Sequence, residues 1–169
     1  GLVGWYGGTI NNSYYDKTST GQANAVGDGT GTVTATDITV ANRYSRNGYS
    51  NLGTWSLLAG TTNVYVAKDA SNQNQWVMIE GQTRPFLWSE YSTNINNLHQ
   101  LQLMAVDLTK NYTVHHNIDA TATNGVNTSD MWSTAGFSPI GTYGNEFKGK
   151  FDGLNHTISN LYINRPSQN

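Results

Sequence analysis

Residues 136–164 read GFSPIGTYGNEFKGKFDGLNHTISNLYIN, in which short runs of β-forming residues are separated by Gly and Asn turns. Near its end, Leu161 and Ile163 alternate with Asn160, Tyr162 and Asn164, so the two aliphatic side chains share one face of a strand. Strands this short, with few hairpin signals, favour coils of a parallel β-helix over the longer antiparallel strands of a sandwich. We therefore predict an all-β solenoid, with an antiparallel β-sandwich as the alternative.

The composition of the 169-residue chain agrees with a turn-rich β protein. Gly, Asn, Ser and Thr are abundant, and these residues disfavour helix interiors. Aromatic residues make up 11% of the chain, enough apolar area to argue against disorder. Charged residues make up only 12% and the formal net charge is −2, so neither nucleic acid nor an anionic membrane is an expected partner.

Two features are missing from the sequence, namely cysteine and a long apolar run. The chain has no cysteine, so it has no disulfide and no thiolate ligand or nucleophile. It also has no apolar run near the roughly 20 residues that a membrane helix needs, and we predict no membrane insertion.

Further β-forming segments occur along the chain, and one segment has helical periodicity. Leu98, Leu101, Ala105 and Leu108 recur at helical spacing, which predicts one short helix near 93–108 with Ser92 or Thr93 as its N-cap. The strands predicted before this helix include residues 9–15, 32–40, 55–58, 63–67 and 75–80.

The opening stretch resembles the GLUG-type repeat of filamentous-haemagglutinin-like bacterial surface exoproteins. That repeat has a Gly-Phe-x-Pro-Ile-Gly element followed by Phe-x-Gly-x-Phe-Asp-Gly-x-x-His-x-Ile-x-x-Leu. The matching positions are Gly136, Phe137, Pro139, Ile140, Gly141, Phe147, Gly149, Phe151, Asp152, Gly153, His156, Ile158 and Leu161.

Residues 76–93 and 1–22 also resemble these proteins, whereas residues 23–75 match no family that we can name. The resemblance implies a right-handed parallel β-helix that is secreted, as by two-partner secretion, and exposed on the bacterial cell surface.

The order of the motifs predicts how copies would join. In the family, the Ile-Ser-Asn-Leu strand precedes a Gly-Leu-Val-Gly element, which here stands at the start of the chain. We therefore expect residues 1–169 to be one period of a tandem array, in which residues 1–22 complete the motif begun at 136–169 of the preceding copy. The residues expected at the junction are Gly1, Leu2, Val3, Gly4, Leu161 and Ile163.

The function expected from this arrangement is structural and adhesive. Copies would stack head-to-tail into a rod or filament that presents a multivalent surface, because solenoid units bury their ends only against neighbours. Host or environmental glycans, or other cells, are the further partners expected. The alternative function is a carbohydrate-binding or polysaccharide-cleaving β-helix.

Few residues invite a catalytic or metal-binding interpretation, and we predict no enzyme, no metal and no cofactor. His115 and His116 are adjacent, so on a strand they point to opposite faces and cannot chelate one ion together. Asp119 and Asp152 on neighbouring coils would be the acid and base of the alternative, polysaccharide-cleaving function.

Surface features offer two more sets of candidate sites. Several aromatic residues, among them Trp5 and Trp132, have either a packing role or a sugar-stacking role. Sequons for glycosylation occur at Asn11, Asn111, Asn127 and Asn155, of which Asn127, Asn111 and Asn155 are the glycosylation candidates.

Overall fold

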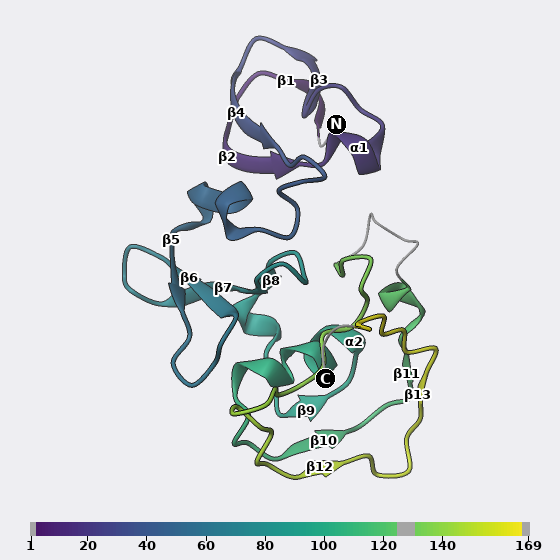
Figure 1. Cartoon of the computed structure of the whole chain (residues 1–169). Helices are drawn as coiled ribbons and strands as arrows, with labels where there is room; N and C mark the ends of the chain where they lie inside the picture. Colours follow the sequence, from purple (N-terminus) through teal and green to yellow (C-terminus); the bar gives the residue numbers. More distant parts are fainter. Residues whose placement is uncertain (1–2, 125–130, 167–169) are drawn as a thin grey trace.

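The computed structural model describes residues 3–124 and 131–166 and has a mostly-β architecture of small sheets (Figure 1). The strands described in these ranges form five sheets, of which four are parallel and one is antiparallel. The predicted right-handed parallel β-helix over residues 1–169 is wrong, because the parallel strand pairs do not continue into one coil. An antiparallel sheet lies between them (Figure 1). The alternative, an antiparallel sandwich, agrees with this one sheet and not with the parallel pairs among the described strands.

Two parallel strand pairs form the N-terminal part, at the top of Figure 1. A Cβ atom on Gly29 would lie 1.9 Å from the Tyr6 carbonyl oxygen, and the φ of Gly29 is 151°. Only glycine allows this close backbone approach, so residues 26–29 can form a strand beside β1. The paired strands are β1 (Val3–Tyr6) with β3 (Val26–Gly29), and β2 (Thr9–Tyr15) with β4 (Thr32–Asp37).

The middle of the chain forms the antiparallel sheet, in the order β5-β6-β7-β8. Three short loops reverse the chain, and each contains a residue in the left-handed region, namely Gly60 with φ 79°, Asn72 with φ 62° and Gly81 with φ 75°. The Asp69 carboxylate fixes the second loop by accepting from the backbone N–H groups of Ser71 and Gln73. The strands are β5 (Thr54–Leu57), β6 (Val64–Lys68), β7 (Asn74–Ile79) and β8 (Phe86–Leu87).

Short parallel strands return in the C-terminal part, at the bottom of Figure 1. β10 (Tyr112–Val114) lies between β9 (Asn94–Ile95) and β12 (Phe151–Asp152). β11 (Ile118–Asp119) pairs with β13 (Ile158–Ser159).

Helices are few and short in the described residues, and the helix predicted near 93–108 is wrong in its extent. Its first residues form β9 instead, and the N-cap is Asn97, whose side chain accepts from Gln100 N, rather than Ser92 or Thr93. The helices are α1 (Lys17–Thr20), α2 (Leu98–Gln102) and the 3-10 turns η1 (Arg46–Leu52), η2 (Trp88–Glu90), η3 (Leu103–Val106) and η4 (Thr121–Thr123). Among the described residues, no helix has the length and apolar character to span a membrane.

The main core joins the antiparallel sheet to the C-terminal strands. Trp132, which is 1% exposed, packs its ring edge-to-face against Phe86 of β8. Leu98 and Leu101 of α2 are buried in the same cluster, as their helical spacing predicts. A smaller cluster of Ile38, Tyr49 and Met78 connects the N-terminal part to the antiparallel sheet.

Candidate functional site

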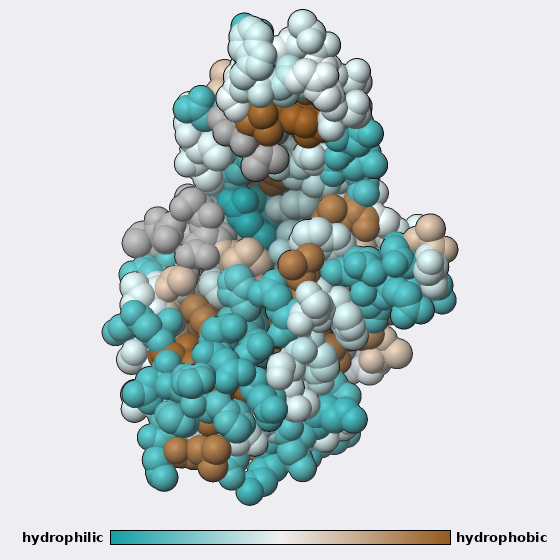
Figure 2. Space-filling view, turned by 180° about the vertical axis from the view of Figure 1, so that it is seen from behind, coloured by the Kyte–Doolittle hydropathy of each residue, from teal (hydrophilic) through white to brown (hydrophobic). Residues whose placement is uncertain are grey.

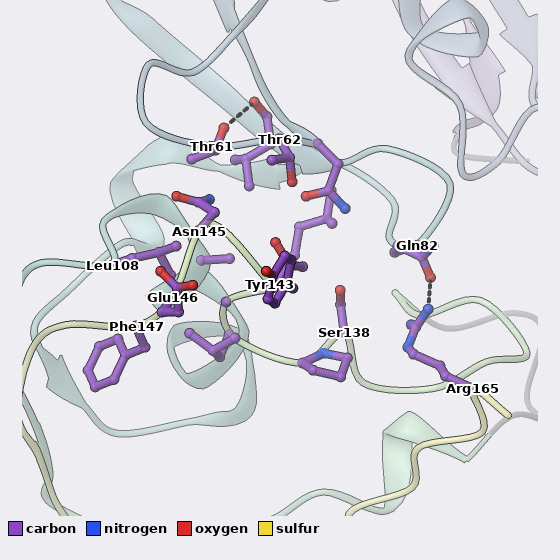
Figure 3. Close-up of a pocket in the computed structure, with 18 residues that line it drawn as sticks. Thr61, Thr62, Gln82, Leu108, Ser138, Tyr143, Asn145, Glu146, Phe147 and Arg165 are labelled. Carbon is purple, nitrogen blue, oxygen red and sulfur yellow. Dashed lines mark hydrogen bonds between the residues drawn. The ribbon is translucent and has the colours of Figure 1, made fainter. Parts of the chain in front are cut away.

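A groove of about 770 Å³ lies between the β5–β6 connection and the segment that follows Phe137 (Figure 3). The charged side chains among its described lining residues are Glu146 and Arg165, so the groove has no net formal charge. Its apolar lining includes Val64, Ile79, Leu108, Pro139, Ile140 and Phe147. Its other polar side chains include Thr61, Thr62, Asn63, Gln82 and Asn145.

A serine hydroxyl points into this groove (Figure 3). Ser138 is 7% exposed, and both of its backbone polar groups are bonded to Gln102. No described residue makes a hydrogen bond to Ser138 Oγ. The Ser138 hydroxyl therefore reaches the open space of the groove, where it presents a donor and acceptor to whatever fills the groove.

Gln102 holds the wall of the groove in place. Its side chain, which is fully buried, donates to Ser138 O at 2.9 Å and accepts from Ser138 N at 2.9 Å and from Trp132 Nε1 at 2.8 Å. Gln102 was not predicted from the sequence to have a role in a site. The one sequence feature that indicates a buried Gln102 is its position four residues after Leu98, on the same face of the helix.

The rim of the groove carries an exposed aromatic ring. Tyr143 is 99% exposed and lies in a turn closed by two backbone hydrogen bonds between Thr142 and Asn145. The Glu146 carboxylate accepts from Gly144 N at 2.9 Å, and backbone N–H donors, including its own, lower the pKa of Glu146. The turn therefore presents the ring and an ionised carboxylate together.

Arg165 lies on the opposite side of the groove from Glu146 (Figure 3). Its guanidinium group donates to Gln82 Oε1 and to the carbonyl oxygens of Gly136 and Phe137. Arg165 thus ties the end of the described chain to the loop after β7 and closes this side of the groove.

The GLUG-like residues have several different structural roles. Phe137 is buried in the main core, and Ile158 of β13 packs against that core. The Phe147 ring lies 6.1 Å from the ring of Tyr112, while Pro139 and Gly141 line the groove. The first half of the motif therefore shapes the groove, starting from Gly136, whose carbonyl oxygen accepts from Arg165.

The second half of the motif forms a turn between β12 and β13. Asp152 accepts from Leu154 N, and His156 N donates to the Gly153 carbonyl oxygen. The His156 ring lies within 3.4 Å of Asn117 Oδ1. Asp-Gly turn chemistry accounts for these residues without a ligand.

Gly149 is the motif position where a side chain has least room. A Cβ atom there would lie 1.8 Å from the Lys110 carbonyl oxygen, a backbone atom. We expect Gly149→Ala to lower the free energy of unfolding by about 2–4 kcal/mol, because the backbone must move apart. The matched control is Gly153→Ala, since the nearest atom to a Cβ at Gly153 is 3.9 Å away. Urea denaturation measures both, and equal effects would contradict this explanation.

The residues expected at the junction between copies lie at the two ends of the fold. Gly1 and Leu2 lie outside the described residues, whereas Val3 and Gly4 belong to β1. Leu161 and Ile163 are 41% and 47% exposed. The structure does not bring the two sets together within one chain.

β12 and β13 each have one side without a strand partner among the described residues. We call these sides the open strand edges. Exposed apolar side chains accompany them, namely Phe151, Leu154, Leu161 and Ile163. Figure 2 shows a largely hydrophilic face with small, separate hydrophobic spots, so the apolar area offered on that face is scattered.

The glycosylation candidates differ in whether the asparagine side chain has a structural role in the fold. Asn111 Oδ1 accepts from Lys150 N at 2.8 Å, so the Asn111 side chain has a structural bond. Asn155 is exposed in the turn between β12 and β13, with φ 63°. Asn127 lies outside the described residues.

The ionisable residues form pairs rather than metal clusters. His99 Nδ1 lies 2.6 Å from Glu90 Oε2, and the His99 ring packs edge-to-face on Phe86 and Trp132. The rings of His116 and His156 are 6.5 Å apart. Within residues 3–124 and 131–166, no group of three or more His, Cys, Asp or Glu side chains could hold a metal ion. No sequence pattern links Glu90 to His99, so this pair was not predicted.

Asp119 and Asp152 lie outside the described lining of the groove. Hydrogen bonds from the Thr121 and Asn160 side chains lower the pKa of Asp119 to about 2. The pKa of Asp152 is also lowered, by the Leu154 backbone N–H and by Lys150. Both carboxylates stay ionised near neutral pH, which leaves neither suited to donate a proton.

A buried ion cluster links the N-terminal part to the antiparallel sheet. The Asp16 carboxylate lies 2.9 Å from Arg43 Nη2 and 2.6 Å from Arg84 Nη2. Arg43 is 1% exposed and Asp16 is 7% exposed. Asp16 also accepts from Ser19 N as the N-cap of α1. Its role in the fold is therefore structural.

No family model, curated protein or solved structure matches this chain. The likeness to the GLUG-type repeat consequently stays a prediction that rests on the residues of the motif. The same holds for the expectation that residues 1–169 are one period of a tandem array.

Proposed function

We propose that this chain is a structural and adhesive module of a secreted bacterial surface fibre, and that its copies associate head-to-tail. The observation that carries the proposal is the pair of open strand edges on β12 and β13 with exposed apolar side chains beside them. The likeness of residues 136–161 to repeats of surface exoproteins supports the location outside the cell.

Small parallel sheets explain why association would be favourable. Parallel strands usually lie inside larger, covered sheets, whereas β11–β13 and both N-terminal sheets have only two strands each. An unpaired strand offers its N–H and C=O groups to another chain, so a strand of a second copy can extend the sheet. The N-terminal strands β1 to β4 are parallel too, and they are the partners that we propose for β12 and β13 of the next copy.

Repetition would supply the adhesive strength. The apolar area beside the open strand edges is divided among a few side chains, so a single contact would be weak. Linked copies convert weak contacts into strong attachment, because each further contact forms at a high effective concentration.

The experiment replaces two exposed aliphatic residues beside β13 with lysine. We expect Leu161→Lys/Ile163→Lys to weaken self-association of the concentrated chain by about tenfold or more, because two charged side chains would replace apolar ones and would lose water at the joint. Sedimentation velocity measures the association, and electron microscopy shows whether rods form.

The control is Leu57→Lys/Leu87→Lys, which places the same two charges on aliphatic residues that are 49% and 44% exposed on β5 and β8, outside the proposed joint. It should associate like the unchanged chain. A chain that stays monomeric at millimolar concentration, or equal association of all variants, would contradict the proposal.

A further inference from the structure

We propose that the groove beside Tyr143 binds an uncharged, hydroxyl-rich oligosaccharide. The inference rests on the proposed adhesive function and names its ligand. It follows from three properties of the groove: its charge, its exposed ring and the serine hydroxyl that points into it.

The charge of the groove favours a neutral ligand. Glu146 and Arg165 balance each other, and Arg165 is already bonded to Gln82 and to two backbone carbonyl groups. A phosphate or a uronic acid would need a cationic group not engaged in this way. The remaining polar groups are hydroxyls and amides, such as those of Thr61 and Asn145, which can both donate to and accept from sugar hydroxyls. The volume of about 770 Å³ lies within the range of small-ligand sites.

The Tyr143 ring is placed to stack on a sugar. It is 99% exposed, although a ring of this size is usually at least partly buried. The turn between Thr142 and Asn145 fixes its backbone, so little backbone entropy would be lost on binding. One face of a pyranose ring presents C–H groups, which pack against an aromatic ring while the hydroxyls point outward to polar groups.

The Ser138 hydroxyl supplies a specific polar contact in the groove. Its side chain points into the groove and has no hydrogen-bond partner among the residues that the structure describes. Gln102 fixes the Ser138 backbone on both sides of its Cα atom, so the hydroxyl is presented at a defined position. A ligand hydroxyl at this position would satisfy it.

The test uses the intact chain and neutral trisaccharides, namely cellotriose, maltotriose and mannotriose, with trigalacturonate as the anionic comparison. Saturation-transfer NMR detects binding, and titration calorimetry gives the Kd. We expect at least one neutral trisaccharide to bind with a Kd of about 1 mM or lower and trigalacturonate to bind more weakly.

Two substitutions locate the site. We expect Tyr143→Ala to raise the Kd about tenfold and Ser138→Ala to raise it about threefold. The control is Trp5→Ala, which removes another exposed ring, 74% exposed, far from the groove in the sequence and on β1. It should leave the Kd unchanged. Since Tyr143 is almost fully exposed, Tyr143→Ala should melt at the temperature of the unchanged chain.

Three results would overturn the inference. These are no binding of any neutral trisaccharide, equal binding by Tyr143→Ala and the unchanged chain, or tighter binding of trigalacturonate. Each is separable from the proposed function, because self-association is measured without sugar. If the chain self-associates but binds no sugar, the proposed fibre function is retained and the proposed sugar ligand is rejected.

Discussion

Asp16→Asn is expected to lower the free energy of unfolding by about 3–5 kcal/mol, measured by urea denaturation at neutral pH. The substitution removes one negative charge and leaves Arg43, which is 1% exposed, and Arg84 as neighbouring cations. Asparagine is as good an N-cap as aspartate, so the cap on Ser19 N is retained. The loss therefore reports the ion cluster rather than α1.

The same carboxylate makes stability depend on pH. Burial raises the pKa of Asp16, but hydrogen bonds from the Ser19 backbone and the Arg84 side chain outweigh it, and the pKa is lowered from 3.8. A lowered pKa contributes stability above the unfolded value near 3.9, and that contribution is lost as the pH falls through the folded value. The unchanged chain should therefore lose stability in acid below about pH 4, and Asp16→Asn should lose less.

Asp28→Asn is the matched control for this substitution. Asp28 is exposed on β3, and its carboxylate accepts from Gly29 N, a bond that asparagine can also make. The control should unfold near the concentration of urea that unfolds the unchanged chain. If Asp28→Asn costs as much as Asp16→Asn, the loss does not come from the buried cluster.

Gln102→Met is expected to lower the free energy of unfolding by about 3 kcal/mol or more. Methionine has a similar volume, but it leaves three buried partners unsatisfied, the N–H and C=O of Ser138 and the indole N–H of Trp132. Each such group costs about 1–3 kcal/mol. The free energy comes from urea denaturation, and near-ultraviolet circular dichroism follows the environment of Trp132.

Gln100→Met is the control on the same helix. The Gln100 side chain is only partly buried and bonds to Asn96, through the Asn96 backbone N–H and side chain. This substitution should cost less than about 1 kcal/mol. If Gln102→Met were equally mild, Gln102 would not be the residue that holds the wall of the groove.

The strands could be predicted from the sequence because their patterns are local. Thr32–Asp37 alternates exposed and half-buried residues, and the predicted run at 32–40 covers it. The pairing of strands could not be predicted in the same way. The hairpin at Asp69–Gln73 has no Asn-Gly or Asp-Gly pair and depends on the Asp69 side chain, so the antiparallel sheet was mistaken for further parallel coils.

The helix prediction failed for a related reason. Leu98 and Leu101 are buried as their spacing indicates, but the pattern of apolar residues does not show where a helix begins or ends. Asn97 caps the first turn, and the chain tightens into a 3-10 turn after Gln102.

The candidate site was the least predictable part. Tyr143 and Ser138 lie within the stretch that resembles the GLUG-type repeat, yet nothing in the sequence shows that the tyrosine is exposed and the serine is mostly buried. Arg165 reaches Gln82, which is 83 residues away, and no local pattern links such distant positions.

The ion cluster also constrains the order in which the protein can fold as it is made. Asp16 can pair with Arg84 only after Arg84 has been synthesised, 68 residues later, which takes roughly several seconds at usual rates of synthesis. The hydrogen bond of Tyr44 forms later still, because its hydroxyl donates to the Trp132 carbonyl oxygen 88 residues away. Strands β1 to β4 are thus without their final contacts to the antiparallel sheet until those later residues have been made.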